Sequence, residues 1–251
     1  MAQGKNVYFI SDLHLGASYF DDPIEKERRV VRWLDSVKDD AAHIYLLGDI
    51  LDYWYEYRYV VPRGFTRFFG KVAQLSDAGV RFTWFIGNHD IWIFDYLPHE
   101  LGVDVVDGSV TTDILGKRFY LAHGDGVGQH KLSFRIIRSI FRNRFCQFLY
   151  SAIHPRWTIP FAHRWSQSSR SSHTDARHAP SSKARDVIYS FTEQYAAEHP
   201  EIDFFIYGHL HTVDDRPVGS GARLVVIGDW ITNDSYARFD GTTLSVHHFP
   251  Q

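Results

Sequence analysis

The segment Tyr45-Leu-Leu-Gly-Asp49 places a carboxylate directly after an apolar, strand-like run. In an α/β sheet the carboxyl ends of the strands open onto the ligand-binding crevice, and a glycine at such an end lets a bound ion come close to the backbone. A single Gly-Asp pair is typical of an ordinary turn. Whether Asp49 does chemistry therefore depends on whether similar polar residues follow other strands.

Four other segments repeat this arrangement of a strand-like run followed by polar residues. They follow Ile10, Ile86, Ala122 and Tyr207 and read Ser-Asp-Leu-His, Gly-Asn-His-Asp, His-Gly-Asp and Gly-His-Leu-His. Asp12 and His14 are two residues apart, so in an extended segment their side chains project to the same side. The candidate metal ligands are Asp12, His14, Asp49, Asn88, His123, His209 and His211.

Carboxylate, imidazole and amide groups together suit divalent ions such as Mn²⁺, Zn²⁺ or Fe²⁺. Seven ligands are too many for one tetrahedral site and few enough for two sites that share Asp49. Two dications about 3.5–4 Å apart stabilise the attacking and leaving oxygens when a phosphate ester is hydrolysed. Because only two of the seven ligands are anionic, two such ions leave a formal positive charge that attracts phosphate. The pattern therefore predicts a two-metal phosphoesterase centre.

Apolar periodicity predicts the elements that position these residues. We expect helices over 23–38, 63–78 and 181–199, and strands over 6–10, 44–47, 82–86, 103–106, 110–115, 119–122, 204–207, 224–227, 236–239 and 244–249. The last three strands are expected to complete a second sheet. Helix–strand units followed by β-rich segments indicate an α/β fold with two sheets packed face to face.

The stretch from Val127 to His178 differs from the rest in charge. It contains nine Lys or Arg and one acidic residue, so it carries +8 while the remainder carries −11. This difference indicates an insertion with an anionic partner. Lys131 to Ile153 reads as one long helix, with Arg135, Arg138 and Arg142 on one face, and a shorter helix is expected over 156–166. We interpret the insertion as a lid; the alternative is a helical hairpin packed on its own core.

Composition narrows the class of protein. Hydrophobic residues make up 44% and charged residues 23% of the 251 residues, which is typical of one large folded domain. No apolar run approaches the ~18 residues of a membrane span. The single cysteine, Cys146, and an N-terminus without the features of a signal peptide predict a cytoplasmic location.

The order Asp-x-His, Gly-Asp-x-x-Asp, Gly-Asn-His-Asp, His-Gly, Gly-His-x-His resembles the calcineurin-like metallophosphoesterases over Asp12 to His211. The resemblance implies a four-layer α/β/β/α sandwich, a single domain over 1–251 with a helical lid insertion at about 127–180. It implies that His89 stabilises or protonates the leaving oxygen and that Asp52 orients His89. The implied ligands are Asp12, His14, Asp49 and His211 for one metal, and Asp49, Asn88, His123 and His209 for the other.

Within that superfamily, the Leu-Gly-Asp49 segment with Trp54, the basic insertion before Lys183 and the Gly-Asp-Trp230 segment resemble the UDP-2,3-diacylglucosamine diphosphatases of lipid A biosynthesis. This implies that a water activated by two Mn²⁺ ions attacks the α-phosphorus and yields UMP and 2,3-diacylglucosamine 1-phosphate. It implies a nucleotide-sugar lipid as substrate, peripheral contact of the basic lid with the inner membrane and no obligate protein partner. The implied substrate-binding residues are Asn88, His89, Trp54, Arg177, Ser182, Lys183 and His209.

Several alternatives stay open at this stage. That family carries Arg where this chain has His89, which leaves the substrate open. A nucleotide or nucleic-acid phosphodiesterase would also use a basic, aromatic insertion, although nucleic acid is the less expected partner. A non-catalytic scaffold of the same fold is expected to lack metal ligands, and none is missing here. Trp54 and the aromatic residues beside it either cap the core or line a substrate cleft.

Overall fold

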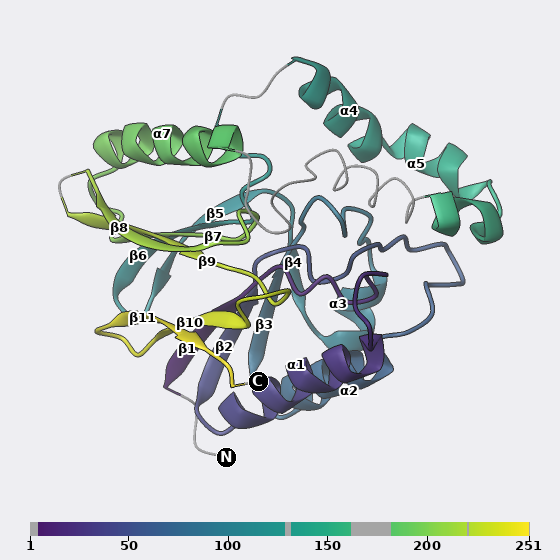
Figure 1. The fold of residues 1–251 in the computed structure, drawn as a ribbon, viewed down its shortest axis with the longest axis horizontal. Coiled ribbons are helices and arrows are strands. Elements are labelled where there is room, and N and C mark those ends of the chain that lie inside the picture. The colour runs from purple at the N-terminus through teal and green to yellow at the C-terminus, as the bar shows by residue number, and fades with distance from the viewer. Residues whose placement is uncertain (1–4, 129–131, 162–181, 220, 251) are drawn as a thin grey trace.

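Two β-sheets lie face to face at the centre of the computed structural model, which describes residues 5–128, 132–161, 182–219 and 221–250 (Figure 1). In order across the first sheet, the strands are β11 (Leu244–His248), β10 (Ser235–Phe239), β1 (Asn6–Ile10), β2 (Ala41–Leu46), β3 (Arg81–Phe85) and β4 (Asp104–Val106). In the second sheet they are β5 (Ser109–Ile114), β6 (Lys117–Ala122), β7 (Phe204–Tyr207), β9 (Ala222–Ile227) and β8 (Val213–Val218).

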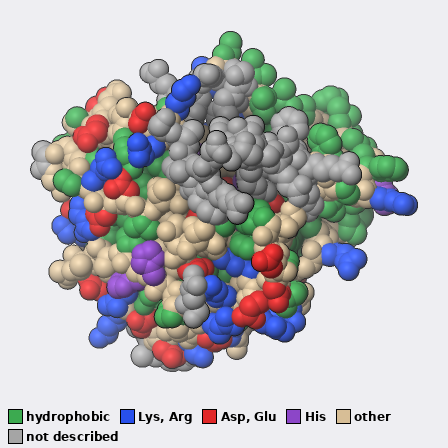
Figure 2. Space-filling model, in the orientation of Figure 1, with side chains coloured by type: hydrophobic (Ala, Val, Ile, Leu, Met, Phe, Trp, Pro, Cys, Tyr) green, Lys and Arg blue, Asp and Glu red, His purple; other side chains and the backbone are tan. Residues whose placement is uncertain are grey.

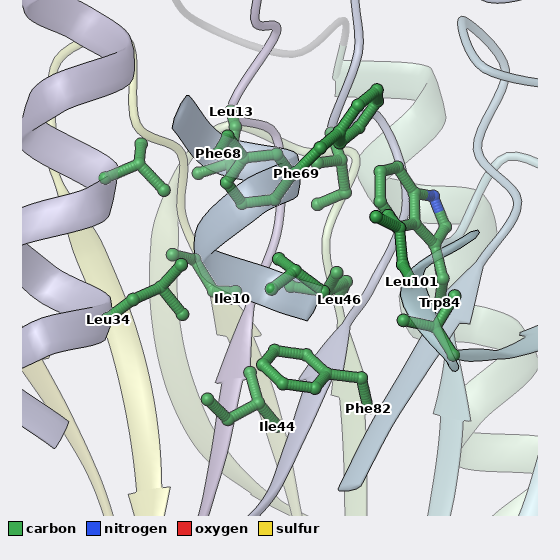
Figure 3. Packing of buried hydrophobic residues seen from close by; sticks show 14 of the residues in the cluster. Ile10, Leu13, Leu34, Ile44, Leu46, Phe68, Phe69, Phe82, Trp84 and Leu101 are labelled. Carbon is green, nitrogen blue, oxygen red and sulfur yellow. The ribbon is translucent and has the colours of Figure 1, made fainter. Parts of the chain in front are cut away.

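Helices cover the outer face of each sheet, which confirms the four-layer α/β/β/α arrangement. The first sheet is covered by α1 (Pro23–Val37) and α2 (Thr66–Asp77), with the short α3 (Tyr96–Leu101) beside them, and the second sheet by α7 (Ser182–Glu198). Leu34 of α1 and Phe68 of α2 face Ile10 and Leu46 of the sheet (Figure 3). Between the sheets, Phe119 stacks on Phe9 with 5.8 Å between ring centroids.

The central strands are buried on both faces, and their side chains alternate between two cores. In β1, Val7 and Phe9 point into the core between the sheets, whereas Tyr8 and Ile10 point toward the helices. β1, β2, β3 and β4 run parallel to one another, as do β6, β7 and β9. Strands that run the same way bring their carboxyl ends to one edge, where the polar segments begin.

The structure corrects one expectation about the sheets and adds two elements that were not expected. β10 and β11 do not complete the second sheet, because β10 pairs antiparallel with β1 and so extends the first. The sequence analysis missed β8 and α3. β8 reads Val-Asp-Asp-Arg-Pro-Val and lies at a sheet edge, where charged residues and proline are tolerated and no apolar alternation is needed.

The insertion contains a break where one long helix was expected. α4 (Leu132–Arg142) and α5 (Arg144–Ser151) are separate helices, and a third helical segment covers residues 155–161. Asn143 has an extended backbone, and its side chain accepts hydrogen bonds from the amides of Phe145 and Cys146. An asparagine that caps a new helix in this way ends the preceding one.

Among the residues that the structure describes, no helix is long and apolar enough to cross a membrane.

Candidate metal centre

Five loops at the carboxyl ends of β1, β2, β3, β6 and β7 converge at one edge of the sandwich. Backbone hydrogen bonds join them: the Asp12 amide donates to Gly48 O at 3.1 Å, and the His14 amide donates to Asp49 O at 3.0 Å. The Gly208 amide donates to His123 O at 3.0 Å. All seven side chains that the sequence singled out lie in these loops, and the contacts below link six of them directly.

One group of donor atoms is formed by Asp12, His14 and His211, whose ligand atoms lie within 4.8 Å of one another. His211 Nε2 is 3.3 Å from Asp12 Oδ1, and His14 Nε2 is 3.8 Å from the same oxygen. His14 Nε2 is also 3.8 Å from Asp49 Oδ2. These are the four residues that the resemblance assigns to the first metal.

A second group is formed by Asp49, His123 and His209, again within 4.8 Å of one another. His123 Nε2 is 3.4 Å from Asp49 Oδ2 and 3.2 Å from Asn88 Oδ1. Asp49 Oδ2 therefore lies within reach of imidazoles from both groups. This is the position that a ligand shared by two ions must occupy, and the assignment of each residue to one ion stays a prediction.

The backbone of the site is strained. Asp12, His14, Asp49, His209 and His211 all have positive φ, between 46° and 63°. Residues other than glycine rarely adopt this left-handed backbone conformation. Those that do are kept in it only where the surrounding structure holds them. Close packing holds them here: a Cβ atom on Gly87 would lie 2.2 Å from Asp49 Oδ1. Five strained residues in one cluster indicate a functional site.

Two buried atoms at the centre of the site test whether a cation fits there. Asp12 Oδ1 and His14 Nε2 form no hydrogen bond with any group in the described part of the chain, although both side chains are about 1% exposed or less. Leaving buried polar atoms unpaired costs free energy. A dication among these atoms would satisfy both, so the residues fit the group. These clusters suggest divalent metal binding; they do not identify the metal.

Contacts on the far side of three of the candidate imidazole ligands fix their orientation. His123 Nδ1 donates to Leu47 O at 2.8 Å. His14 Nδ1 is 3.3 Å from Asp52 Oδ1, and His211 Nδ1 is 3.4 Å from Asp229 Oδ2. In all three rings Nδ1 is engaged and Nε2 faces the carboxylates. Such outer partners set the tautomer and orientation of histidines that bind metals.

The buried charges shift one another's pKa. Burial alone would lower the pKa of His14, but its contacts with Asp12 and Asp52 raise that pKa to about 10. Burial also works against a charged His123, and the Asp49 charge outweighs it and raises the pKa well above the ordinary value. Burial would raise the pKa of Asp49, but His123 and the other nearby imidazoles hold it well below the usual range.

His89 and Asp52, the predicted catalytic pair, lie together at the rim. The His89 side chain is 18% exposed, and its Nδ1 is 3.1 Å from Asp52 O and 3.5 Å from Asp52 Oδ1. Because a carbonyl oxygen only accepts, Nδ1 carries a hydrogen and Nε2 is the nitrogen that can exchange a proton. The His89 ring stands edge-on to His14, with 4.8 Å between centroids.

The predicted substrate-binding residues outside the metal centre do not share one environment. Trp54 does not line a cleft, because it is fully buried against Phe69 and Tyr96; of the two alternatives, the structure shows the core position. Lys183 is exposed on α7. The Ser182 side chain and Arg177 lie outside what the structure describes.

The aromatic residues after Asp52 fasten the insertion to the body. Tyr55 Oη donates to Gln147 O at 2.6 Å, Tyr53 Oη is 3.1 Å from Tyr150 Oη, and Tyr57 Oη is 2.8 Å from Thr158 Oγ1. On α4, Arg138 pairs with Asp125 and Arg142 with Asp107. These two ion pairs attach α4 to the body, whereas Arg135 remains exposed.

Sequence reasoning gave no role to two buried carboxylates, Asp90 and Asp229. Asp229 Oδ1 accepts from the amides of Ile231, Thr232 and Asn233, which holds its other oxygen beside His211. Asp90 connects the loops after β2 and β3, and burial, with the charge of Asp49, raises its pKa to about 6. The available signal was that Asp90 ends the Gly-Asn-His-Asp segment and Asp229 lies within the Gly-Asp-Trp segment.

The fold and the site define a class of protein. A model of the calcineurin-like phosphoesterase family matches residues 5–213, and the chain belongs to that family. It is 45% identical to a protein of Porphyromonas gingivalis named UDP-2,3-diacylglucosamine hydrolase, with 96% of each chain covered. It is 23% identical to a protein of that name from Histophilus somni (90% of this chain, 92% of the relative) and 26% identical to one from Nitrosococcus oceani (89% and 86%). The chain is a metal-dependent hydrolase of this family.

Metal binding should release protons from the site. The raised pKa values favour protonated His14 and His123 when no metal is bound, and a nitrogen must lose its proton to bind an ion. Apparent affinity should therefore rise with pH, for His14 until about pH 10. Calorimetric titration with Mn²⁺ at pH 7, in buffers of different ionisation enthalpy, should count about two protons released per chain. The His14→Ala variant should release about one fewer; no release from the wild type would contradict the assignment.

Proposed function

We propose that the protein hydrolyses UDP-2,3-diacylglucosamine to UMP and 2,3-diacylglucosamine 1-phosphate. The observation that carries the proposal is the convergence of Asp12, His14, Asp49, Asn88, His123, His209 and His211 at one edge of the sandwich, with Asp49 within reach of both groups. Such a site suits phosphoester or phosphoanhydride hydrolysis. The particular substrate is supported by the name of the relative at 45% identity.

The groups that would hold two divalent ions are Asp12, His14, Asp49 and His211 on one side and Asp49, Asn88, His123 and His209 on the other. Bound there, the ions would lower the pKa of a water molecule and stabilise charge on the phosphate oxygens. We propose Mn²⁺ as the native ion, which the carboxylate, imidazole and amide donors suit. Asn88, His89 and His209 are proposed to contact the substrate's phosphates as well.

In the proposed reaction the water oxygen forms a bond to the α-phosphorus while the bond from that phosphorus to the bridging oxygen breaks. His89 Nε2 gives its proton to the bridging oxygen, which leaves with the sugar phosphate. The Nδ1–H contact with Asp52 O orients the ring for this transfer, and the Asp52 carboxylate beside it favours the protonated ring. The proton lost by the attacking water then restores His89.

We propose that the chain is a single domain with residues 127–180 as a lid that holds the acyl chains. Of eighteen exposed large hydrophobic side chains in the described residues, eleven lie between 132 and 161. Figure 2 shows hydrophobic side chains gathered over α4 and α5 at its upper right. Exposed apolar patches of this kind mark surfaces that bind lipid or protein. This favours a lipid substrate over the alternative, a nucleotide or nucleic-acid phosphodiesterase.

The same surface supports a location on the cytoplasmic side of the inner membrane. Arg135, Arg144 and Arg156 are exposed among the apolar residues of the lid. A basic residue near an anionic membrane surface contributes about 1 kcal/mol to binding. We propose peripheral association through this face, without an obligate protein partner. Arg177, Ser182 and Lys183, at the return from the lid, are proposed to contact the substrate.

Activity on purified UDP-2,3-diacylglucosamine with Mn²⁺ tests the proposal. Mass spectrometry should detect UMP and the sugar 1-phosphate in equal amounts, and chelation of the metal should stop their formation. Asp49→Ala should abolish turnover and reduce bound metal, because this residue serves both ion positions. Release of UMP at a normal rate by that variant would contradict the site, whereas cleavage of nucleotide or nucleic-acid diesters in place of the lipid would favour the alternative.

His89→Ala should lower kcat about 10²–10⁴-fold, which is the usual contribution of a general acid. Both metals should stay bound, since the ring faces the leaving oxygen. The defect should be largest for a phosphodiester with a poor leaving group and small for an aryl ester that needs no protonation. An equal loss on both substrates, or the loss of one metal, would show that His89 is not the acid.

Phe145→Ser with Phe148→Ser tests the lid. Both side chains are 68% exposed, whereas Phe141 packs on Trp92 and accepts its indole hydrogen bond through the backbone. Loss of two phenyl rings that contact acyl chains should lower activity on the diacylated substrate about 100-fold or more. Hydrolysis of a small chromogenic phosphodiester should be unchanged.

Ile24→Ser is the matched control for the lid variant. Ile24 is also an exposed apolar residue, 43% accessible, but it lies on α1, away from the insertion. Its replacement should leave both activities unchanged. Equal losses on the two substrates in the lid variant would point to a structural hairpin.

A further inference from the structure

Asp90 is a fully buried carboxylate surrounded by hydrogen-bond donors. Its Oδ1 accepts from the Gly87 amide at 2.8 Å, and its Oδ2 accepts from the Ile50 amide at 3.0 Å and from Trp84 Nε1 at 3.2 Å. Asp90 is absent from the groups of donor atoms that could hold an ion among the described residues. Its carboxylate instead joins the end of β3 to the loop after β2.

A second contact runs in the opposite direction between the same two loops. Asp49 Oδ1 accepts from the His89 amide at 2.8 Å, while Asp90 Oδ2 accepts from the amide of Ile50, the residue after Asp49. Each loop therefore places a carboxylate on the backbone of the other. Asn88 and His89 lie between Gly87 and Asp90, which the Gly87 amide joins to the Asp90 carboxylate, and the His89 amide is also bound by Asp49, so both residues are held relative to Asp49.

We propose that Asp90 is a positioning residue that sets Asn88 and His89 against Asp49. This inference rests on the proposed function, in which Asn88 binds metal and His89 protonates the leaving oxygen. The loop has little freedom to move otherwise, because Gly87 is packed against the Asp49 carboxylate so closely that a Cβ atom has no room. A displacement of about 1 Å at a catalytic group costs about 100-fold in rate.

The chemistry of the pocket requires a carboxylate at position 90. The three groups aimed at its oxygens are all donors, and a carboxylate accepts from all of them. An asparagine of the same shape would turn an NH₂ group toward at least one donor. One buried amide or indole N–H would then lose its partner, and the loop would have to shift to reach another acceptor.

The test compares Asp90→Asn with Glu56→Gln as a matched control. Glu56 is a buried carboxylate with the same kind of partners: it accepts from Trp54 Nε1 at 3.0 Å and from the amides of Phe94 and Asp95. It anchors the start of α3 and does not join the two ligand loops. A merely structural role for Asp90 predicts that both variants lose stability and leave the chemistry unchanged.

The first readout is the rate on two phosphodiesters that differ only in leaving group. Asp90→Asn should lose about 100-fold on the poor leaving group and much less on the good one, as expected when His89 is misaligned. Glu56→Gln should lower the two rates equally or not at all. If the rate of Asp90→Asn depends on the leaving group just as the wild-type rate does, the proposal is overturned.

The second readout is Mn²⁺ binding, which needs no turnover and stays informative if the proposed substrate is wrong. Asp90→Asn should weaken one of the two sites about 10- to 100-fold, as loss of an outer partner does, and leave the other unchanged. Two unchanged sites would overturn the proposal. If Asp90→Asn does not fold, Trp84→Phe serves as the second variant, because it removes one donor to Asp90. Trp84→Phe should change both readouts in the same direction by a smaller factor. No change in either readout would also overturn the proposal.

Discussion

The structure depends on the burial of two carboxylates and several imidazoles in one water-poor cluster. Asp12 and Asp49 are almost fully buried, and both lie 3.8 Å from His14 Nε2. Removing charges from water costs several kcal/mol per ion unless opposite charges accompany them. In the metal-free protein, protons on His14 and His123 supply that charge, which is why their pKa values are raised. Divalent ions would supply positive charge in place of these protons, so the same electrostatics favour metal binding.

Holding such a cluster requires a rigid frame, and the two sheets provide it. Parallel strands that are buried on both faces end at one edge, and hydrogen bonds between their loops fix the spacing of the donor atoms. Positive φ at five of the seven candidate ligands is tolerated because the core around them is close-packed. The outer contacts from Asp52, Leu47 and Asp229 then orient the rings. The geometry of the site is thus a consequence of the packing and hydrogen bonds around it.

The insertion is attached to this frame through residues that neighbour the site. Tyr53, Tyr55 and Tyr57 follow directly after Asp52 and contact α5 and the segment beyond it, while Arg138 pairs with Asp125, two residues after His123. One loop therefore carries a candidate bridging ligand, Asp49, at its start and the tyrosines that hold the insertion at its end. The attachment uses hydroxyl groups, ion pairs and the packing of Phe141 on Trp92. The side chains of Phe145, Phe148 and Trp157 stay exposed.

The family resemblance implied the layered α/β/β/α class, and the sequence by itself determined the ligand-bearing segments and the central strands. These follow from local patterns: apolar runs of strand length, and polar residues that replace them abruptly at Asp12, Asn88 and His209. The start of α1 could also be predicted from local sequence, because the Asp22 side chain caps the amide of Glu25. The assignment of the ligands to individual ions stays a prediction.

Only the tertiary structure decided the sheet to which β10 and β11 belong, the burial of Trp54 and the partners of Arg138, Asp90 and Asp229. Each depends on pairing between segments that are distant in sequence, and neither residue type nor spacing encodes which edge or donor will be adjacent. Even the break at Asn143, a local capping event, was hidden because the apolar pattern continues across it. A carboxylate's role is set by the donors that surround it, and those are known only once the chain has folded.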